Sequence, residues 1–425
     1  MHTDVVSSIV RRAALATSVA VCLGIGMAQA AVSPVIQVNV ADDALGRPLL
    51  ARDAAGRVLV VWRQSVQTND GFHSAITARL YSADGTPLGE AFPISDPSAA
   101  SANDPAAAMD AAGNFVVSWV QSASGTRQLL TRRFAPGGVA QGEPIVVTEL
   151  TAEGGRSAVA MDRSRGFVVA WQEVVLREVG AGRRGASTVY ARRYDEEGTA
   201  TSLSVTVNSS TTEPTSSGEL YEPTAPALAL LDADGSFIVA WHDLARQAQL
   251  GLRGVIDARR FSRTGQPLGA EFRVSPAMPG GASQPVADAD SNGTIAIAWG
   301  SSHPTGDDSY SGEDLLLRRY SAKGDALGDA QPVSHELLIA LPAALSMNRS
   351  GHYVTAWVGT SSSYCCVPAH LTYLRFTPNG QPDGEPVTVS DEYPQSSPAA
   401  ALGDDGSVAV GWNLGGIVKL RLYSD

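Results

Sequence analysis

Histidines and one pair of adjacent cysteines are the side chains of this sequence best suited to chemistry. An imidazole beside a carboxylate, as in His242-Asp243, can act as a general base or bind a metal ion. No two histidines have the His-x-His or His-x-x-x-His spacing of a metal pair, so the sequence predicts no metal site and no cofactor. We take Asp243 and four histidines of irregular segments as candidate binding residues: His242, His303, His335 and His370.

The adjacent cysteines are Cys365 and Cys366, the only ones after residue 30. In an oxidising compartment they could form a vicinal disulfide, which would stiffen its loop and present a sulfur-rich edge beside Tyr364. We predict this bridge and count all three residues as candidate binding residues. Two reduced thiols or an intermolecular bridge are the alternatives.

Carboxylates cluster in the same irregular segments. Two facing carboxylates can hydrolyse a glycosidic bond, but the sequence does not show which of them face each other. We therefore expect a solvated rim and assign no catalytic residue. Residues 288–293 resemble a D-x-D-x-N-G calcium loop, yet no acidic ligand follows, so we expect an ordinary turn. The acidic pairs are Glu173 and Glu178, Glu219 and Glu222, Asp307 and Asp308, Glu313 and Asp314, and Asp391 and Glu392.

The first 30 residues have the pattern of an export signal. Arg11 and Arg12 precede an uncharged apolar run, and Ala28-Gln29-Ala30 fits a small-x-small cleavage site. We predict a secreted or periplasmic protein whose mature chain, residues 31–425, forms one domain. The arginine pair also allows a twin-arginine signal, although we favour a Sec signal.

The composition excludes several classes of protein and partner. The chain of 425 residues is 44% hydrophobic and 17% charged with 42 Gly, which argues against a disordered or polytopic membrane protein. Without residues 1–30, it has 29 basic and 42 acidic residues, a net charge of −13. Lys323 and Lys419 are its only lysines, so no basic stripe could neutralise phosphates. We predict a monomer that neither binds nucleic acid nor inserts into membranes.

Seven tryptophans mark an internal repeat of 52 to 70 residues. Residues four and two before each Trp are apolar, except Thr355 in the sixth repeat, which indicates a strand, and small residues such as Ala170 and Gly411 directly precede the Trp. Asp nine before Trp and Gly six before it form D-x-x-G, which suits a tight hairpin turn. Repeat three departs, with Arg165 where Gly is expected. The tryptophans are Trp62, Trp119, Trp171, Trp241, Trp299, Trp357 and Trp412.

A third strand in each repeat ends in an aromatic residue, with Arg two positions earlier in every repeat but the sixth, which has Leu374. Gly follows the aromatic by four residues in the first six repeats, and a fourth strand comes next. Four short strands repeated seven times predict an all-β, seven-bladed β-propeller of four-stranded antiparallel blades. The last repeat lacks its fourth strand, so we expect residues 34–40 to pair into it and close the ring.

The unit D-x-x-G-x-[aromatic]-V-V-x-W … R-R-[YF]-x-x-x-G resembles the repeats of secreted or surface-attached bacterial propeller proteins, many of unknown function. The resemblance covers residues 34–425 and implies the fold rather than an activity, because every repeated position is structural. The unit lacks the Gly-His and Trp-Asp pairs of WD40 repeats and the S-x-D-x-G-x-T-W turn of sialidases.

Function should therefore lie where the repeat is irregular. The turns D-x-x-G and Y-x-x-x-G share one face of the disc, and the uneven loops after each Trp share the other. Our leading hypothesis is a non-enzymatic module that binds a carbohydrate or protein through loops of blades three to six. The alternative is a secreted glycan hydrolase or lyase that uses loop carboxylates, or His with a metal. The longest of these loops span 172–188, 209–224, 242–254, 300–314 and 358–370.

Overall fold

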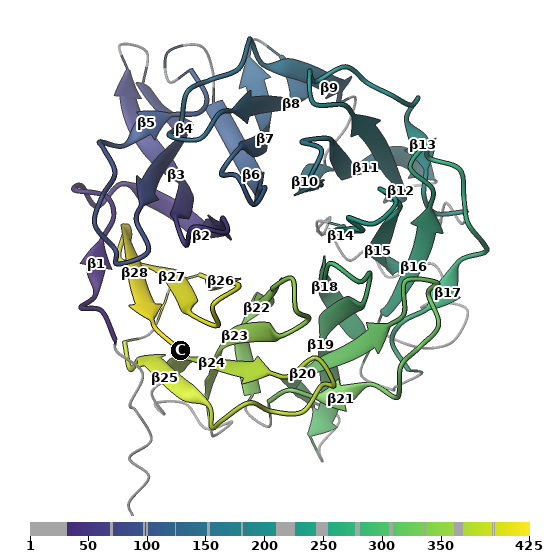
Figure 1. Cartoon of the computed structure of the whole chain (residues 1–425). Helices are drawn as coiled ribbons and strands as arrows, with labels where there is room; N and C mark the ends of the chain where they lie inside the picture. The colour runs from purple at the N-terminus through teal and green to yellow at the C-terminus, as the bar shows by residue number, and fades with distance from the viewer. Residues whose placement is uncertain are drawn as a thin grey trace, which may run out of the picture.

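The chain forms seven four-stranded antiparallel sheets arranged in a ring, a seven-bladed β-propeller (Figure 1). This computed structural model describes residues 32–425 except 69–70, 97, 99–100, 124, 151–153, 180–181, 210–225, 244–253, 277–280, 306–308, 335–336, 361–368, 393 and 395. Along 174–187, 303–313 and 337–342 only the backbone is described. The described part consists of strands and turns, and no helix in it is long and apolar enough to span a membrane.

Within each blade the strands follow one another from the axis of the ring to its rim (Figure 1). The innermost strands are β2 (Ala44–Arg52), β6 (Ser101–Met109), β10 (Gly154–Met161), β14 (Ala227–Leu230), β18 (Ala282–Ala289), β22 (Leu337–Met347) and β26 (Ala399–Leu402). The second strands are β3 (Val58–Thr68), β7 (Phe115–Ala123), β11 (Phe167–Val179), β15 (Phe237–Asp243), β19 (Ile295–Thr305), β23 (Tyr353–Thr360) and β27 (Val408–Leu414).

The outer half of each blade has the same order. The third strands are β4 (Gly71–Tyr81), β8 (Thr126–Phe134), β12 (Gly182–Tyr194), β16 (Val255–Phe261), β20 (Ser309–Tyr320), β24 (His370–Phe376) and β28 (Ile417–Tyr423). The rim strands are β5 (Phe92–Pro93), β9 (Ile145–Glu149), β13 (Val205–Thr206), β17 (Phe272–Arg273), β21 (Gln331–Pro332), β25 (Val387–Ser390) and β1 (Ile36–Gln37).

The two ends of the chain meet in the seventh blade, as predicted. β1 pairs antiparallel with β28, with Ile36 opposite Leu420. This pairing supplies the fourth strand that the last repeat lacks. The ring therefore closes with a hydrogen-bonded ladder rather than an open sheet edge.

The D-x-x-G turns have the predicted geometry. Oδ1 of Asp53 accepts hydrogen bonds from the backbone N–H groups of Ala55 (3.0 Å) and Arg57 (2.8 Å). Gly56 has a φ of +80°, a conformation that favours glycine. In the third blade Arg165 takes this position with a φ of +63°, so the departure in the sequence produces a strained turn instead of a different fold.

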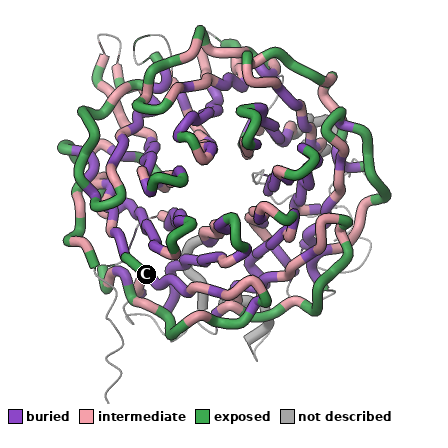
Figure 2. Tube along the Cα trace, viewed as in Figure 1, coloured by how far each residue is buried: buried purple, intermediate pink, exposed green. Residues whose placement is uncertain are grey.

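The hydrophobic core lies between neighbouring blades, and the turns around it are exposed (Figure 2). Each Trp is at most 2% exposed and packs against the preceding blade; Trp119, for example, lies in one cluster with Val61 and Ile76 of blade one. Three indoles donate Nε1–H to the side chain two residues on: Trp62 to Gln64 (3.2 Å), Trp119 to Gln121 (3.1 Å) and Trp171 to Glu173 (2.9 Å).

The repeated arginines join blades, which confirms their structural role. Arg79 Nε donates to the carbonyl of Gly89 in its own blade (3.0 Å), and Nη1 donates to Val38 beside β1 (3.3 Å). Its guanidinium carbon also lies 5.7 Å from the centroid of the Tyr81 ring, within cation–π range. The same bond to the preceding blade joins Arg192 to Val147, Arg259 to Val207 and Arg421 to Val389.

Two segments expected to be long loops are mainly strand. In blade three, β11 and β12 stay paired up to Val179 and Gly182, and in blade five β19 and β20 stay paired up to Thr305 and Ser309. The expectation was wrong because an alternating apolar pattern identifies only those strand residues that pack in the core. A hydrogen-bonded hairpin can continue beyond the packed part of a blade without any apolar period.

Candidate binding surface

Hairpins of unequal length project from the face opposite the D-x-x-G turns. The second strand of each blade begins four residues before its Trp, so differences in length measure how far each hairpin extends. β11 has 13 residues and β19 has 11, whereas β15 between them has seven. At about 3.3 Å per residue, the hairpin of blade three extends roughly 20 Å beyond the level of Asp243, the last residue of β15 that the structure describes.

The described part of blade four on this face lies between two projecting ribbons. Its last described residues on this face are Asp243 of β15 and Val255 of β16, which lie opposite each other in the ladder. We call this place the blade-four mouth, defined by His242, Asp243, Gly254 and Val255 and flanked by the ribbons β11–β12 and β19–β20. His242 and Asp243, two of the candidate binding residues, lie here as the last described residues of β15.

His242 faces blade five. Side chains alternate along a strand, and Trp241 packs against blade three, so its neighbour points the other way. A β-carbon on Gly254 would lie 2.2 Å from His242 Nε2 and 2.6 Å from the carbonyl oxygen of Ala282 in β18. Glycine is thus needed to admit the imidazole at this inter-blade position.

The imidazole of His242 is buried and without a hydrogen-bond partner among the described residues. Both Nδ1 and Nε2 lack one. Burial lowers the pKa of His242 to about 4, while the charge of Asp243 opposes the shift. The ring is therefore neutral at neutral pH and offers one donor and one acceptor, the pair that a hydroxyl or amide ligand would match.

A buried ion pair lies one residue deeper in the same blade. Asp257 is opposite Trp241 in the ladder and is 0% exposed. Arg273 Nε on β17 donates to its Oδ1 at 2.7 Å. The residues at this position in other blades are Thr77, Leu130, Tyr190, Leu316, Thr372 and Lys419, so the pair is particular to blade four.

The other predicted site residues are placed only in part. His370 begins β24 opposite Gly359, at the same face, and the backbone of His303 lies in β19 opposite Gly312. Tyr364, Cys365, Cys366 and His335 lie outside the described residues, as does the predicted disulfide. Within the described part of the chain, no three His, Cys, Asp or Glu side chains gather into a possible metal site. Residues 288–293 form an ordinary turn, as predicted.

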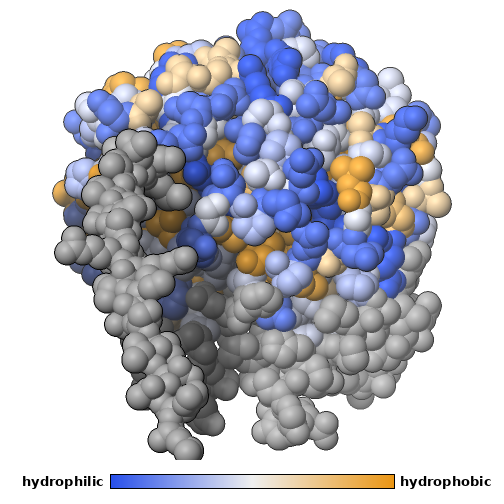
Figure 3. Space-filling view, turned by 60° about the horizontal axis from the view of Figure 1, so that its bottom comes forward, coloured by the Kyte–Doolittle hydropathy of each residue, from blue (hydrophilic) through white to orange (hydrophobic). Residues whose placement is uncertain are grey.

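The visible surface is mostly hydrophilic, with apolar residues scattered in small groups (Figure 3). An interface built on such a surface would depend on hydrogen bonds and charges more than on one apolar patch.

Both described cavities lie on the turn face, which the sequence suggested was uniform. One, of about 150 Å³, lies where turns of six blades converge on the axis. There Arg163 Nε pairs with Asp232 at 2.8 Å, and Arg349 Nε pairs with Asp404 at 3.6 Å. The other, of about 260 Å³, lies between blades three and four. The exchange of Gly for Arg165, which pairs with Glu196 of this cavity, is a signal in the sequence that could have drawn attention to this region.

These features define a seven-bladed β-propeller with an irregular hairpin face. The sequence matches no family model and no curated protein. Among solved structures, the chain is similar to a protein of unknown function from Dyadobacter fermentans, with 12% identity and a TM-score of 0.50 over 94% of this chain and 100% of that one.

Two further solved structures share the arrangement more loosely. One is the Hadza microbial sialidase Hz136, with 11% identity and a TM-score of 0.48 over 92% of this chain and 68% of that one. The other is a fungal alcohol oxidase in complex with copper, with 15% identity and a TM-score of 0.46 over 93% and 76%. At these identities the likeness shows the fold alone.

Proposed function

We propose that this protein is an exported, monomeric binding propeller that recognises a carbohydrate or protein at the blade-four mouth. The observation that carries the proposal is the uneven hairpin face, where the ribbons of blades three and five flank His242, whose two ring nitrogens have no hydrogen-bond partner among the described residues. Irregular hairpins on a closed scaffold are a common design for recognition.

The chemistry of the mouth supports a binding role. His242 offers a neutral donor and acceptor whose burial keeps it uncharged at neutral pH. A ligand that supplies one acceptor and one donor would remove the free-energy cost of leaving these ring nitrogens without hydrogen bonds. Hydroxyl-rich sugars and peptide amides both carry such groups.

Trimming the ribbons tests the proposal. In one variant, residues 175–186 are replaced by Asn-Gly, so that a two-residue turn joins β11 to β12. In the control, residues 67–72 of the blade-one ribbon are replaced in the same way. Both variants should keep the melting temperature, because each leaves the buried Trp of its blade and the strand residues before it in place.

The readout is binding of the mature protein to immobilised polysaccharides and to secreted proteins, with assay of the supernatant for cleaved glycan. We expect a ligand that is lost on trimming blade three and kept on trimming blade one. Equal binding by both variants would place recognition elsewhere. Release of glycan fragments by the intact protein would favour the alternative hydrolase or lyase.

A further inference from the structure

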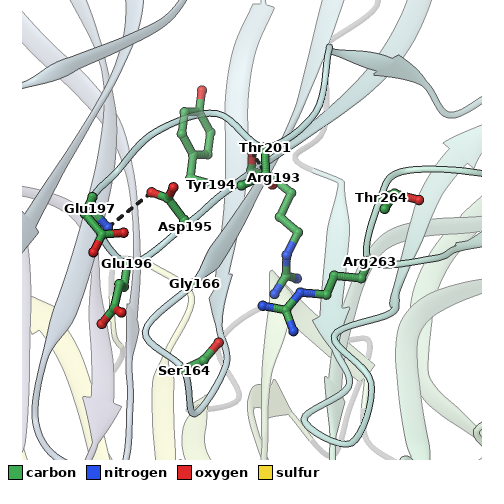
Figure 4. Close-up of a pocket in the computed structure, with 10 residues that line it drawn as sticks. All are labelled: Ser164, Gly166, Arg193, Tyr194, Asp195, Glu196, Glu197, Thr201, Arg263 and Thr264. Carbon is green, nitrogen blue, oxygen red and sulfur yellow. Dashed lines mark hydrogen bonds between the residues drawn. The ribbon is translucent and has the colours of Figure 1, made fainter.

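The pocket between blades three and four lies on the turn face, away from the blade-four mouth. It encloses about 260 Å³ and has a cationic wall and an acidic wall. Figure 4 shows the side chains of Arg193 and Arg263 converging on one side, with the Ser164 hydroxyl below and the carboxylates of Glu196 and Glu197 on the other side. A volume just below that of drug-sized sites suits a molecule the size of one sugar ring.

Arg193 is fixed in place before any ligand arrives. Its side chain is 2% exposed and is held by an ion pair between Nη2 and Asp162 and a bond from Nη1 to the carbonyl of Gly235 (2.9 Å). A β-carbon on Gly235 would lie 3.1 Å from Arg193 Nη2 and 3.2 Å from Arg263 Cδ. Both arginines therefore pack over Gly235, and this glycine keeps the space open.

The pairing of two arginines is peculiar to this interface. Elsewhere the arginine equivalent to Arg193 bonds the next blade's outer turn, as when Arg260 Nη1 donates to Lys323 (2.5 Å) or Arg375 pairs with Asp425. Arg263 comes two residues after the aromatic of its blade and has no hydrogen-bond or ion-pair partner in the described part of the chain. The other blades have Ala83, Pro136, Glu196, Ala322, Pro378 and Asp425 there.

The acidic wall contains three carboxylates, and two of them already have hydrogen-bond or ion-pair partners. Asp195 accepts hydrogen bonds from backbone N–H groups of its own turn, and Glu196 pairs with Arg165, the residue that replaces the turn glycine. No ion pair or side-chain hydrogen bond joins the Glu197 carboxylate to another described residue. The pocket therefore presents an unpaired guanidinium opposite an unpaired carboxylate.

We propose that this pocket binds a small sugar acid. The sugar carboxylate accepts hydrogen bonds from Arg263 beside the positive charge of Arg193. The ring hydroxyls donate to Glu197 and to Ser164 Oγ, whose own hydrogen is donated to Asp162 (2.7 Å). An anion between the arginines relieves the repulsion of two like charges, and guanidinium groups form strong charge-assisted bonds with carboxylates. The proposal is independent of the blade-four mouth.

The repeat itself supplies the variant that tests this. Arg263→Asp places at this position the residue that blade seven has, Asp425, which pairs with the arginine of the preceding blade. The variant should fold with an unchanged or higher melting temperature, because the new carboxylate can pair with Arg193. Lys323→Ala is the control, since it removes one exposed positive charge from the corresponding turn of blade five.

Binding is measured by isothermal titration with D-glucuronate, D-glucose and inorganic sulfate. We expect the mature protein and Lys323→Ala to bind D-glucuronate equally, more weakly at high salt, and not to bind D-glucose. Arg263→Asp should weaken D-glucuronate binding at least about tenfold, the loss of one charge-assisted bond. The ribbon-trimmed variants should bind D-glucuronate normally, so failure of one proposal leaves the other testable.

Three outcomes would overturn the proposal. The first is no detectable binding of D-glucuronate, and the second is unchanged binding by Arg263→Asp. The third is sulfate binding as tight as D-glucuronate binding, which would make the pocket a general oxyanion site rather than a sugar-acid site.

Discussion

Asn39 and Val418, at opposite ends of the chain, are joined by a 2.7 Å hydrogen bond from the Val418 backbone N–H to Asn39 Oδ1. The same side chain donates from Nδ2 to the carbonyl of Gly416 at 2.9 Å. One buried amide thus extends the short β1–β28 ladder beyond its paired residues. The closure of the ring depends on this side chain as well as on strand pairing.

Replacing Asn39 by Ala should weaken the closure. The variant leaves buried backbone groups without partners, so we expect the free energy of unfolding to fall by about 2 kcal/mol. Thermal denaturation followed by circular dichroism measures the change. Val40→Ser is the control, since Val40 is 92% exposed and its replacement should change little. Equal melting temperatures for Asn39→Ala and the wild type would contradict the role given to Asn39.

Replacing Arg165 by Gly should stabilise the fold. The φ of +63° strains any residue with a β-carbon, and relief is worth about 1 kcal/mol. The lost pair with Glu196 is half exposed and contributes little. Gly113→Ala makes the reverse change at an equivalent turn, where the new β-carbon would lie 2.3 Å from Arg57 Nη2. Urea denaturation should move the two variants in opposite directions; a less stable Arg165→Gly would contradict this account.

The architecture could be predicted because each blade repeats the same local solution. Trp119, Gly56 and Arg79 have the same structural roles as their equivalents in other blades: core packing, a tight turn and a hydrogen bond to a backbone carbonyl. A pattern that would be weak in one segment therefore predicts the fold firmly when it recurs seven times. The N-terminal closure was predictable for the same reason, since one strand was missing from the seventh repeat.

The pockets were not predictable from the sequence, because they depend on contacts between blades. Arg193 and Arg263 are 70 residues apart, and nothing in the sequence shows that both pack over Gly235. The length of the ribbons on the hairpin face depends on how far β11–β12 and β19–β20 stay paired. Arg165 breaks a repeated position of the turn face, as Asn348 and Gly403 do, but these departures do not show which turns enclose a pocket.

Replacing His242 by Phe should change the response to acid. The folded-state pKa of His242, about 4, lies below the ordinary value of 6.5, so the unfolded chain binds the proton more tightly. Because protonation of this ring favours the unfolded chain, the free energy of unfolding is unaffected above pH 6.5. It falls by up to about 3 kcal/mol as the pH decreases from 6.5 toward 4. His242→Phe should remove this loss, measured as the difference in unfolding free energy from wild type between pH 7 and pH 4. The same loss in the variant would show that the imidazole does not cause it.

Replacing Asp288 by Asn should remove a pH dependence of stability that is opposite in sign to that of His242. Burial at the end of β18 raises the pKa of Asp288 to about 6, although its oxygens accept bonds from the N–H groups of Ala289 (2.8 Å) and Met347 (2.7 Å). Asp232 and Asp290 raise it further. Because the folded state binds this proton more tightly, its contribution to stability falls as the pH rises from about 4 to 6, by up to about 3 kcal/mol. In the wild type this slope offsets that of His242.

The offset makes the pair of variants informative together. Asp288→Asn loses one acceptor and should be less stable overall, but its stability should rise steeply from pH 4 to 6, since the slope of His242 then acts alone. His242→Phe should show stability that falls over the same range. Urea denaturation at intervals of half a pH unit would measure both curves. Parallel curves for the two variants would mean that His242 does not have the lowered pKa, and Asp288 does not have the raised pKa, that their burial causes.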